Sequence, residues 1–236
     1  MIEKVLNGKN IQKALRQTVS NKGASGVDGM TVKELKSYIQ TNKTKLFTEI
    51  IHQRYKPNAN KGVIIPKSNG KERLLGVPIV VDRMLQQAVS QAIVPDFELE
   101  FKEYSYGFRP NRNAQQAVQQ SQKYIHEGYK YIIDIDLKNF FDEVEHAILL
   151  QLIYRKVKCQ ITMRLIRKWL RAPILIKGKL TRRRKGIPQG SPLGPLLSNI
   201  MLHELDSYLE KQGQKYVRYA DDCAPRTDIY RGYLML

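Results

Sequence analysis

Apolar residues recur along the chain with two different periods, which predict helices and short strands in alternation. Ile11, Leu15 and Val19 lie at helical spacing, and Thr31 with Glu34 three residues later predicts a capping box for a second helix. The helical period returns in the segments 82–93, 113–126, 144–154, 161–170 and 195–209. Apolar runs bounded by turn residues predict strands at 63–65, 73–77, 131–137 and 216–219, and a hairpin at 174–181. This mixture predicts an α+β fold.

The charge of the chain is strongly unbalanced. Its 236 residues include 40 Lys and Arg against 22 Asp and Glu, a net charge of +18. A phosphate backbone is the commonest partner for such an excess, so the balance predicts nucleic-acid binding. No stretch approaches the ~18 consecutive apolar residues of a membrane-spanning helix, and the first residues lack the apolar core of a secretion signal. With two cysteines at no recognisable spacing, these features predict a soluble cytoplasmic protein with no membrane partner.

Two pairs of acidic residues stand at the ends of apolar strands. In the segment 131–137, Asp134 and Asp136 fall on one face, because side chains alternate along a strand. Asp221 and Asp222 follow a second apolar strand, in a sequence suited to a tight hairpin turn. An isolated Asp-x-Asp at a strand end is more often simply solvated. Two strands that end side by side would instead bring Asp136 close to Asp221.

Carboxylates in this arrangement predict magnesium binding. A few hard oxygen ligands that leave room for substrate phosphates are the usual way in which proteins hold Mg²⁺. Two such ions ~3.5–4 Å apart activate an attacking hydroxyl and stabilise a leaving pyrophosphate. The chemistry indicated by these residues is therefore phosphoryl transfer on nucleic acid.

Six short motifs occur in a fixed order along the chain. They are 23–30 (GASGVDGM), 65–78 (IPKSNGKERLLGVP) followed by 82–86 (DRMLQ), 105–110 (SYGFRP), 136–142 (DLKNFFD), 186–199 (GIPQGSPLGPLLSN) and 219–222 (YADD). Any one of them is a weak signal, since a four-letter match recurs by chance. In this order and at this spacing, the set resembles the reverse transcriptase domain of group II intron-encoded reverse transcriptase/maturases, over about residues 20–222.

The resemblance implies a right-hand polymerase fold of the reverse transcriptase kind. It places the fingers, with an N-terminal extension, at residues 1–112 and the palm with the catalytic aspartates at residues 113–222. It implies an RNA-directed DNA polymerase that adds dNTPs to a DNA primer on an RNA template, with two Mg²⁺ ions. In the complete family the protein also helps its intron RNA to fold and splice, a role that depends on a region beyond the palm.

The same resemblance assigns metal ligands. Asp136 and Asp221 would bind the two ions, and Asp222 would support them as the third catalytic aspartate. The backbone carbonyl of Leu137 would complete the shell of one ion.

Four further residues would contact the incoming nucleotide. Lys67 and Arg73 flank the predicted turn at 68–71, and both would reach the triphosphate, as a point charge and as a bidentate fork. Phe141 would pack under the sugar and clash with a 2′-hydroxyl, although without the motif it reads as ordinary core. Gln189 lies in a loop rich in glycine and proline, where its amide can approach the sugar.

Basic residues are concentrated just before that loop. As an isolated feature the run would be a solvated surface, but beside a template–primer cleft it predicts phosphate contacts. The residues are Lys177, Lys179, Arg182, Arg183, Arg184 and Lys185. Arg109, in a Gly-Phe-Arg-Pro turn, is predicted to be a structural residue or a contact to the template backbone rather than a catalytic group.

The resemblance ends at Asp222. The family continues with an apolar strand that returns down the hairpin and then with a thumb, whereas residues 223–236 have an atypical sequence. Pro225 falls where the strand should pair and cannot donate a hydrogen bond, and Arg226 and Asp228 interrupt the apolar run. We therefore expect a truncated chain with the thumb absent. An unpaired edge beside the catalytic turn would loosen the aspartates and impair polymerase activity.

Three alternatives stay open at the level of sequence. A non-catalytic, maturase-like fragment would use the basic surface to bind intron RNA and assist splicing, and its RNA affinity would survive Asp136→Ala. Among enzymes, reverse transcriptases of retrons, diversity-generating elements and CRISPR loci share the palm motifs, and the block at 26–29 argues only against the retron type. A generic basic binding domain would leave six ordered motifs to chance. The sequence gives no indication of oligomeric state.

Overall fold

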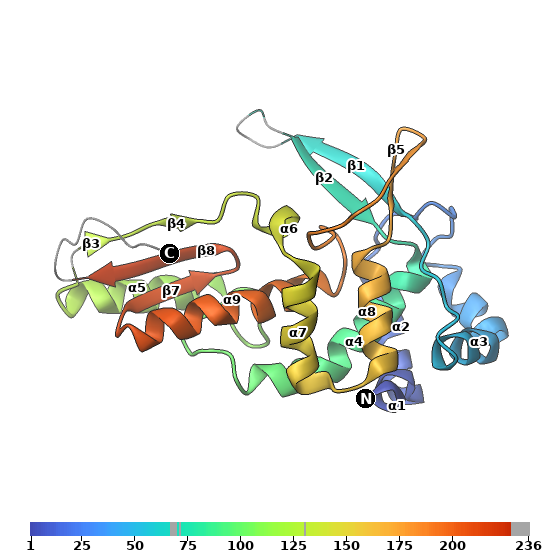
Figure 1. Cartoon of the computed structure of the whole chain (residues 1–236), viewed down its shortest axis with the longest axis horizontal. Coiled ribbons are helices and arrows are strands. Elements are labelled where there is room, and N and C mark those ends of the chain that lie inside the picture. The colour runs from blue at the N-terminus through green and yellow to red at the C-terminus, as the bar shows by residue number, and fades with distance from the viewer. Residues whose placement is uncertain (67–69, 71, 130, 228–236) are drawn as a thin grey trace.

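The computed structural model places two lobes side by side along the long axis of the molecule (Figure 1). It describes residues 1–66, 70, 72–129 and 131–227. The helices of the first lobe are α1 (Ile2–Leu6), α2 (Gly8–Ser20), α3 (Leu35–Ile51), α4 (Val80–Glu98), α7 (His146–Val157) and α8 (Gln160–Leu170). Those of the second lobe are α5 (Ala114–His126) and α9 (Gly194–Lys211), with the short helix α6 (Phe140–Glu143) between the lobes.

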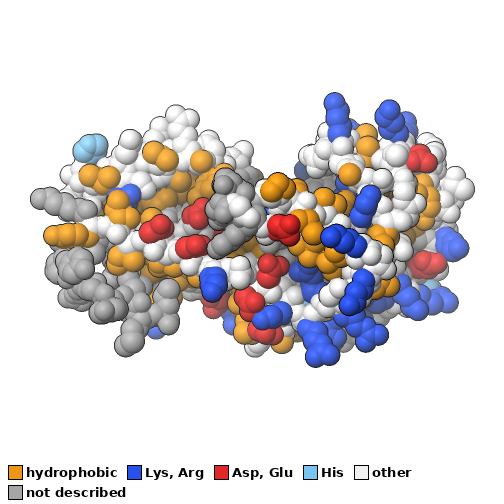
Figure 2. Space-filling view, turned by 90° about the horizontal axis from the view of Figure 1, so that it is seen from above, with side chains coloured by type: hydrophobic (Ala, Val, Ile, Leu, Met, Phe, Trp, Pro, Cys, Tyr) orange, Lys and Arg blue, Asp and Glu red, His pale blue; other side chains and the backbone are white. Residues whose placement is uncertain are grey.

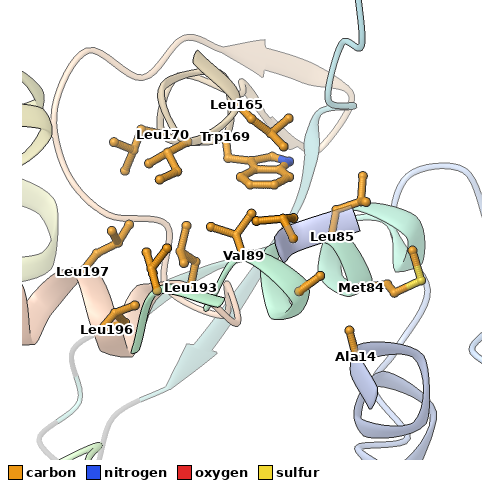
Figure 3. Packing of buried hydrophobic residues seen from close by; sticks show 14 of the residues in the cluster. Ala14, Met84, Leu85, Val89, Leu165, Trp169, Leu170, Leu193, Leu196 and Leu197 are labelled. Atoms are coloured by element: carbon orange, nitrogen blue, oxygen red, sulfur yellow. The ribbon is translucent and has the colours of Figure 1, made fainter. Parts of the chain in front are cut away.

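The largest hydrophobic core forms around α4, which is buried on several sides. Figure 3 shows Trp169 of α8 facing Leu85 and Val89 of α4, while Met84 points the opposite way toward Ala14 of α2. Fully burying a side chain of this size contributes about 1.5–3 kcal/mol, so the layers on both sides of α4 stabilise the first lobe strongly. Among the helices of the described residues, none combines the length and the apolar character needed to cross a membrane.

The sheet of the first lobe joins two hairpins that are far apart in the sequence. Its strands are β1 (Asn60–Pro66), β2 (Glu72–Val77), β5 (Ile174–Ile176) and β6 (Lys179–Thr181), in the order β2-β1-β5-β6. Both hairpins were predicted, but their partnership was not: β1 pairs in parallel with β5. Gly62 allows this contact, because a Cβ there would lie 2.9 Å from the carbonyl oxygen of Leu175. The predicted boundary at residues 112 and 113 thus separates two segments that share one sheet.

The second sheet brings together the strands that carry the acidic residues. They are β3 (Tyr131–Ile132), β4 (Ile135–Asp136), β7 (Lys215–Tyr219) and β8 (Asp222–Thr227). Strand β8 lies in the middle, with β7 antiparallel on one edge and β3 and β4 antiparallel on the other. On one face, Ile135, Tyr216 and Cys223 pack against Leu209 of α9, and α5 covers part of the other face beside β7.

The expectation that Pro225 prevents the returning strand from pairing is wrong. Pro225 lies in β8, opposite Tyr216 of β7. On the other edge, the pairs Ile132–Arg226 and Ile135–Cys223 belong to one continuous register, so Ile133 lies opposite the proline. The Ile133 N–H donates to the Pro225 carbonyl at 2.9 Å, and only the reciprocal bond, which needs a proline N–H, is missing. The edge of β8 beside the turn at residues 220–221 is therefore paired. The strand predicted at 131–137 is interrupted at residues 133–134, opposite Pro225 and Ala224, and it ends at Asp136.

Two predicted helix starts have different outcomes. Asn113 begins α5 with a complete capping box, in which its side chain accepts from the Gln116 N–H and the Gln116 side chain accepts in return from Asn113. The helix predicted behind Thr31 instead begins at Leu35. The Glu34 carboxylate does accept from the Thr31 N–H and hydroxyl, at 2.8 and 2.6 Å, but these bonds close a turn that precedes the helix.

Asp228, which was expected to interrupt the returning strand, lies outside the described residues.

Asp82, in the first turn of α4, is a buried acid that ties three segments together. Its carboxylate accepts hydrogen bonds from the Tyr55 hydroxyl at 2.8 Å, the Trp169 indole N–H at 2.7 Å and the Asn58 N–H at 3.2 Å. Burial raises the pKa of Asp82 to about 6, against the lowering effect of these donors. The folded chain therefore holds a proton on Asp82 more tightly than the unfolded chain does.

This raised pKa predicts a pH dependence of stability. The protonated Asp82 carboxyl stabilises the fold fully at a pH below the pKa that Asp82 has in the unfolded chain. This stabilisation is lost as the pH rises through about 6, the pKa of Asp82 in the folded chain. The Asp82→Asn variant does not titrate at this position and serves as the reference. The unfolding free energy of the parent minus that of the variant should be about 1 kcal/mol larger at pH ~5 than at pH ~7.5. Urea denaturation at both pH values measures this difference. If the difference in unfolding free energy between parent and variant is the same at both pH values, or larger at the higher pH, the raised pKa of Asp82 is contradicted.

Candidate active site

The turn between β7 and β8 carries the acidic pair predicted from the sequence. Tyr219 pairs with Asp222 across the hairpin, which leaves Ala220 and Asp221 as the turn residues. Ala220 has a φ of +58°, in the left-handed region that residues with a Cβ rarely adopt. Asp136 at the end of β4 lies directly opposite Asp222. Both predicted acidic segments are therefore brought to one end of the second sheet.

The strand register places three carboxylates on one face of this sheet. Asp136 and Asp222 share a face because they are directly opposite in antiparallel strands, and Asp134 joins them two residues earlier. The pKa of Asp222 is raised, first by partial burial and then by the negative charges of Asp221, Asp136 and Asp134. The four acids are thus close enough to repel one another, and a cation between them would relieve that repulsion.

The donor set suits magnesium. Carboxylate and backbone carbonyl oxygens are the hard ligands that Mg²⁺ prefers, and Mg²⁺ leaves several positions to water and substrate phosphates. In the part of the chain that the structure describes, no three His, Cys, Asp or Glu side chains converge closely enough to enclose a metal ion. The acids therefore form an open set at the end of the sheet, and the chemistry of their oxygens is what fits them to the ion.

A cavity of about 490 Å³ opens beside the acids. Six of the predicted site residues line it: Asp136, Leu137, Asp221, Arg73, Phe141 and Gln189. All of them except Asp136 and Leu137 also line a neighbouring cavity of about 570 Å³. The structure thus gathers residues from both lobes around one space. Asp222 lines neither cavity, and Lys67 lies outside the described residues.

The loop that carries Gln189 is fixed by its backbone on two sides. The Gln189 carbonyl accepts from the Gly76 N–H in β2 at 2.8 Å, and the Ile187 N–H donates to the Phe141 carbonyl in α6 at 2.6 Å. Gly186, at φ +86°, allows this approach, because a Cβ there would lie 2.8 Å from a carbonyl oxygen of α6. The Gln189 Oε1 is buried without a hydrogen-bond partner among the described residues, so it is available to a bound group.

The predicted basic run extends from the β5–β6 hairpin to the loop at residue 186. Arg183 is partly buried, and this burial lowers its pKa, while Lys185 pairs with Glu143 of α6 at 2.5 Å. Figure 2 shows basic side chains spread over one end of the molecule and acidic side chains gathered nearer its middle. The exposed members of the run are Lys177, Lys179, Arg182, Arg184 and Lys185.

Arg109 is bound within the protein. Its Nε and Nη2 donate to the Glu98 carboxylate at 2.9 and 2.7 Å, and Nη1 donates to the carbonyls of Lys102 and Ser105 at 2.6 and 2.7 Å. The residue is buried, so these bonds hold the segment that follows α4 in place. These internal bonds fit the first of the two predicted roles, a structural one, and a contact to the template backbone stays a prediction.

A buried polar network behind the acidic turn was not predicted from the sequence. Arg218 of β7 and Asp206 of α9 are both fully buried and form an ion pair at 2.6 Å. Ser105 and Asn199 complete the network. The sequence does carry a signal for it, since Asp206 interrupts an apolar helix face and Arg218 an apolar strand. The apolar positions around Asp206 are Leu202, Leu205 and Leu209.

The sequence of this chain matches that of a known protein family. A family model described as reverse transcriptase (RNA-dependent DNA polymerase) matches residues 65–227, more than half of the chain. The chain belongs to the reverse transcriptase family. The match runs through β8 to Thr227, beyond Asp222, where the resemblance in sequence was expected to end.

The similar members of the reverse transcriptase family include group II intron proteins. The chain is 36% identical over 208 residues to protein YkfC of Escherichia coli, covering 86% of this chain and 55% of that protein. It is 33% identical over 213 residues to the group II intron-encoded protein LtrA of Lactococcus lactis, covering 87% and 34%. A putative COX1/OXI3 intron 2 protein of Saccharomyces cerevisiae is 31% identical over 195 residues. The chain thus spans about half, or less, of the length of these relatives.

A solved structure supports the fold. A chain of the Cas6-RT-Cas1–Cas2 complex superposes with a TM-score of 0.62 at 24% identity, covering 96% of this chain and 24% of that chain. At this identity the likeness establishes a reverse transcriptase fold of mixed helices and strands, as predicted from the sequence.

Gly107 provides a test of how tightly the turn at residues 220–221 is held. A Cβ at this position would lie 2.1 Å from the Ala220 backbone nitrogen, so Gly107→Ala must displace the turn. We expect a loss of about 1–3 kcal/mol in unfolding free energy. Gly8→Ala is the matched control, because a Cβ there meets nothing within 4 Å, and its effect should stay within about 0.5 kcal/mol. Equal unfolding free energies for the two variants, measured by urea denaturation, would contradict the close contact.

Proposed function

We propose that this chain forms the polymerase active site of a group II intron-type reverse transcriptase. The reaction is the addition of dNTPs to a DNA primer on an RNA template, by phosphoryl transfer with two Mg²⁺ ions. One observation carries the proposal: Asp136 lies opposite Asp222, and Asp221 in the adjoining turn lines the same cavity as Arg73 and Gln189.

The aspartates would hold the metal ions. Asp136 and Asp221 would be the direct ligands, Asp222 would support them, and the Leu137 carbonyl would complete one shell. When bound there, Mg²⁺ supplies activation of the primer 3′-hydroxyl and stabilisation of the leaving pyrophosphate. The raised pKa of Asp222 supports this assignment, because repulsion among neighbouring acids marks a place where positive charge is missing.

The residues across the cavity would bind the nucleotide. Arg73 is exposed on β2, and its planar guanidinium can contact two phosphate oxygens at once, with Lys67 as a second cation. The buried Gln189 Oε1 would accept a hydrogen bond from the sugar hydroxyl. Phe141 is only partly buried and lines the cavity, so its ring can pack under the sugar and exclude a 2′-hydroxyl.

The two lobes would divide the remaining work. Residues 1–112 would form the fingers with their N-terminal extension, and residues 113–222 the palm, with α7, α8 and the β5–β6 hairpin of that second range packing in the first lobe. The β5–β6 hairpin would add its basic run to the fingers sheet, where Lys177, Lys179 and Arg182 can contact the backbone of template or intron RNA. The net charge of +18 supports the same surface for RNA binding in splicing, as in a maturase.

Primer extension on an RNA template with dNTPs and Mg²⁺ tests the proposal. Asp136→Ala and Asp221→Ala should each lower incorporation by at least about 100-fold, because each removes a group that acts on the reacting phosphate. Glu127→Ala, an exposed acid that follows α5, makes the same change in net charge and should leave incorporation unchanged.

RNA affinity, measured on the same proteins, separates the two candidate functions. We expect all three variants to bind the template as the parent does, because the removed carboxylates do not contact the backbone. A parent that binds RNA but incorporates no nucleotide would favour the non-catalytic, maturase-like function. Incorporation that survives both aspartate changes would place the active site elsewhere.

A further inference from the structure

Arg218 occupies an unusual place for a charged residue. It is the largest of the fully buried side chains in the described part of the chain, and it lies two residues before the turn that carries Asp221. Because side chains alternate along β7, it projects from the face opposite to Asp222 and toward α9. Its guanidinium therefore lies behind the catalytic turn, where it cannot touch substrate.

Every N–H of the Arg218 guanidinium has a partner. Nε and Nη2 donate to the two oxygens of Asp206 at 2.7 and 2.6 Å, and Nη2 also donates to the Ser105 hydroxyl at 2.6 Å. Nη1 donates to the Asn199 side-chain oxygen at 3.0 Å and to the Ala220 carbonyl at 2.8 Å. An arginine has five such donors, so this one is fully satisfied.

The bond to Ala220 connects this network to the catalytic turn. Ala220 holds a left-handed conformation with a Cβ present, so the turn needs support from its surroundings. Arg218 holds the carbonyl of Ala220, while Gly107 packs against its nitrogen. The Asn199 amide donates to the Gly107 carbonyl at 2.9 Å, which joins these two supports.

A stability role alone does not explain this arrangement. Burying an ion pair brings a desolvation penalty that its attraction often fails to offset, and apolar residues of similar volume usually stabilise a core equally well. The pair is bidentate and all its donors are used, so its distinctive property is geometric. It fixes the position of the Ala220 carbonyl, next to Asp221 in the turn.

We infer that Arg218 and Asp206 are positioning residues, which set the turn so that Asp221 can bind metal with Asp222 in support. The inference rests on the proposed function, since it takes Asp221 as a metal ligand. Ser105 and Asn199 act with the pair by orienting the guanidinium. Arg218→Lys keeps the charge but loses the fork, and one ammonium cannot replace five donors in these directions.

Mn²⁺ binding to the purified chain, followed by electron paramagnetic resonance, measures the effect without catalysis. Arg218→Lys should weaken Mn²⁺ affinity by about tenfold or more, as changes behind metal ligands usually do. Ser105→Ala removes a single bond to the guanidinium and should produce a smaller shift in the same direction. In primer extension, both should lower kcat and raise the Mg²⁺ concentration for half-maximal rate, with the KM for dNTP little changed.

The Arg109–Glu98 pair supplies the matched control. It is a second arginine–carboxylate pair with a buried arginine, but among the described residues its hydrogen bonds stay within residues 98–109 and none reaches the turn. Glu98→Gln should reduce stability while leaving Mn²⁺ affinity at the parent value. If Arg218→Lys does not fold, the Mn²⁺ affinity of Ser105→Ala tests the positioning role instead. This variant removes only a hydroxyl group, so it disturbs the packing little.

Failure of the inference differs from failure of the proposed function. If Asp221→Ala abolishes Mn²⁺ binding while folded Arg218→Lys and Ser105→Ala bind as the parent does, the positioning role is overturned. It is also overturned if Glu98→Gln weakens Mn²⁺ binding as much as Arg218→Lys. If Asp221→Ala itself leaves Mn²⁺ binding unchanged, the metal site in the proposed function is wrong, and the inference falls with it.

Discussion

The geometry of the candidate active site depends on one strand that is paired along both edges. Strand β8 takes β7 on one side and the β3–β4 segment on the other, and each register carries an acid to the same end of the sheet. A shift of one residue in either register would turn Asp136 or Asp222 to the opposite face, where Ile135 and Cys223 pack against α9. The hydrophobic face of the sheet therefore fixes which way the carboxylates point.

The cavity beside the acids exists because the two lobes meet through the loop at residues 186–193. This loop bonds to β2 through Gln189 and to α6 through Ile187, so segments from distant parts of the chain line one space. The acids come from the second sheet, while the groups suited to a triphosphate and a sugar come from the first lobe and from this loop. Neither lobe alone contains both kinds of group.

Much of this could be predicted from local patterns in the sequence. The helical period found α2 and α9, and the Asn113 cap marked the start of α5, because these features depend on neighbouring residues. The proximity of Asp136 and Asp221 followed from two apolar strands that end in acids. In each case the local preference and the tertiary structure agree.

The remaining features depend on contacts between distant segments. Pro225 is tolerated because its missing N–H affects a single bond of one edge, which only the register with Ile133 reveals. Two further features could not be predicted from local sequence, because each depends on which distant segments pack together. They are the pairing of β1 with β5 and the ion pair between Arg218 and Asp206. Local sequence patterns predicted the helices, the strands and the acids at the strand ends. They did not predict the buried ion pair behind the turn.

The central position of β8 also sets the order in which the second sheet can form during synthesis. A ribosome makes β3 and β4 long before β8, so in the nascent chain these two strands lack the central strand of their sheet. The first lobe can close once β5 pairs with β1, whereas the second sheet must wait for the last described strand. The turn between β7 and β8 therefore forms only after every other strand of the second sheet has been made, and until then the partly built sheet is open to non-native pairing.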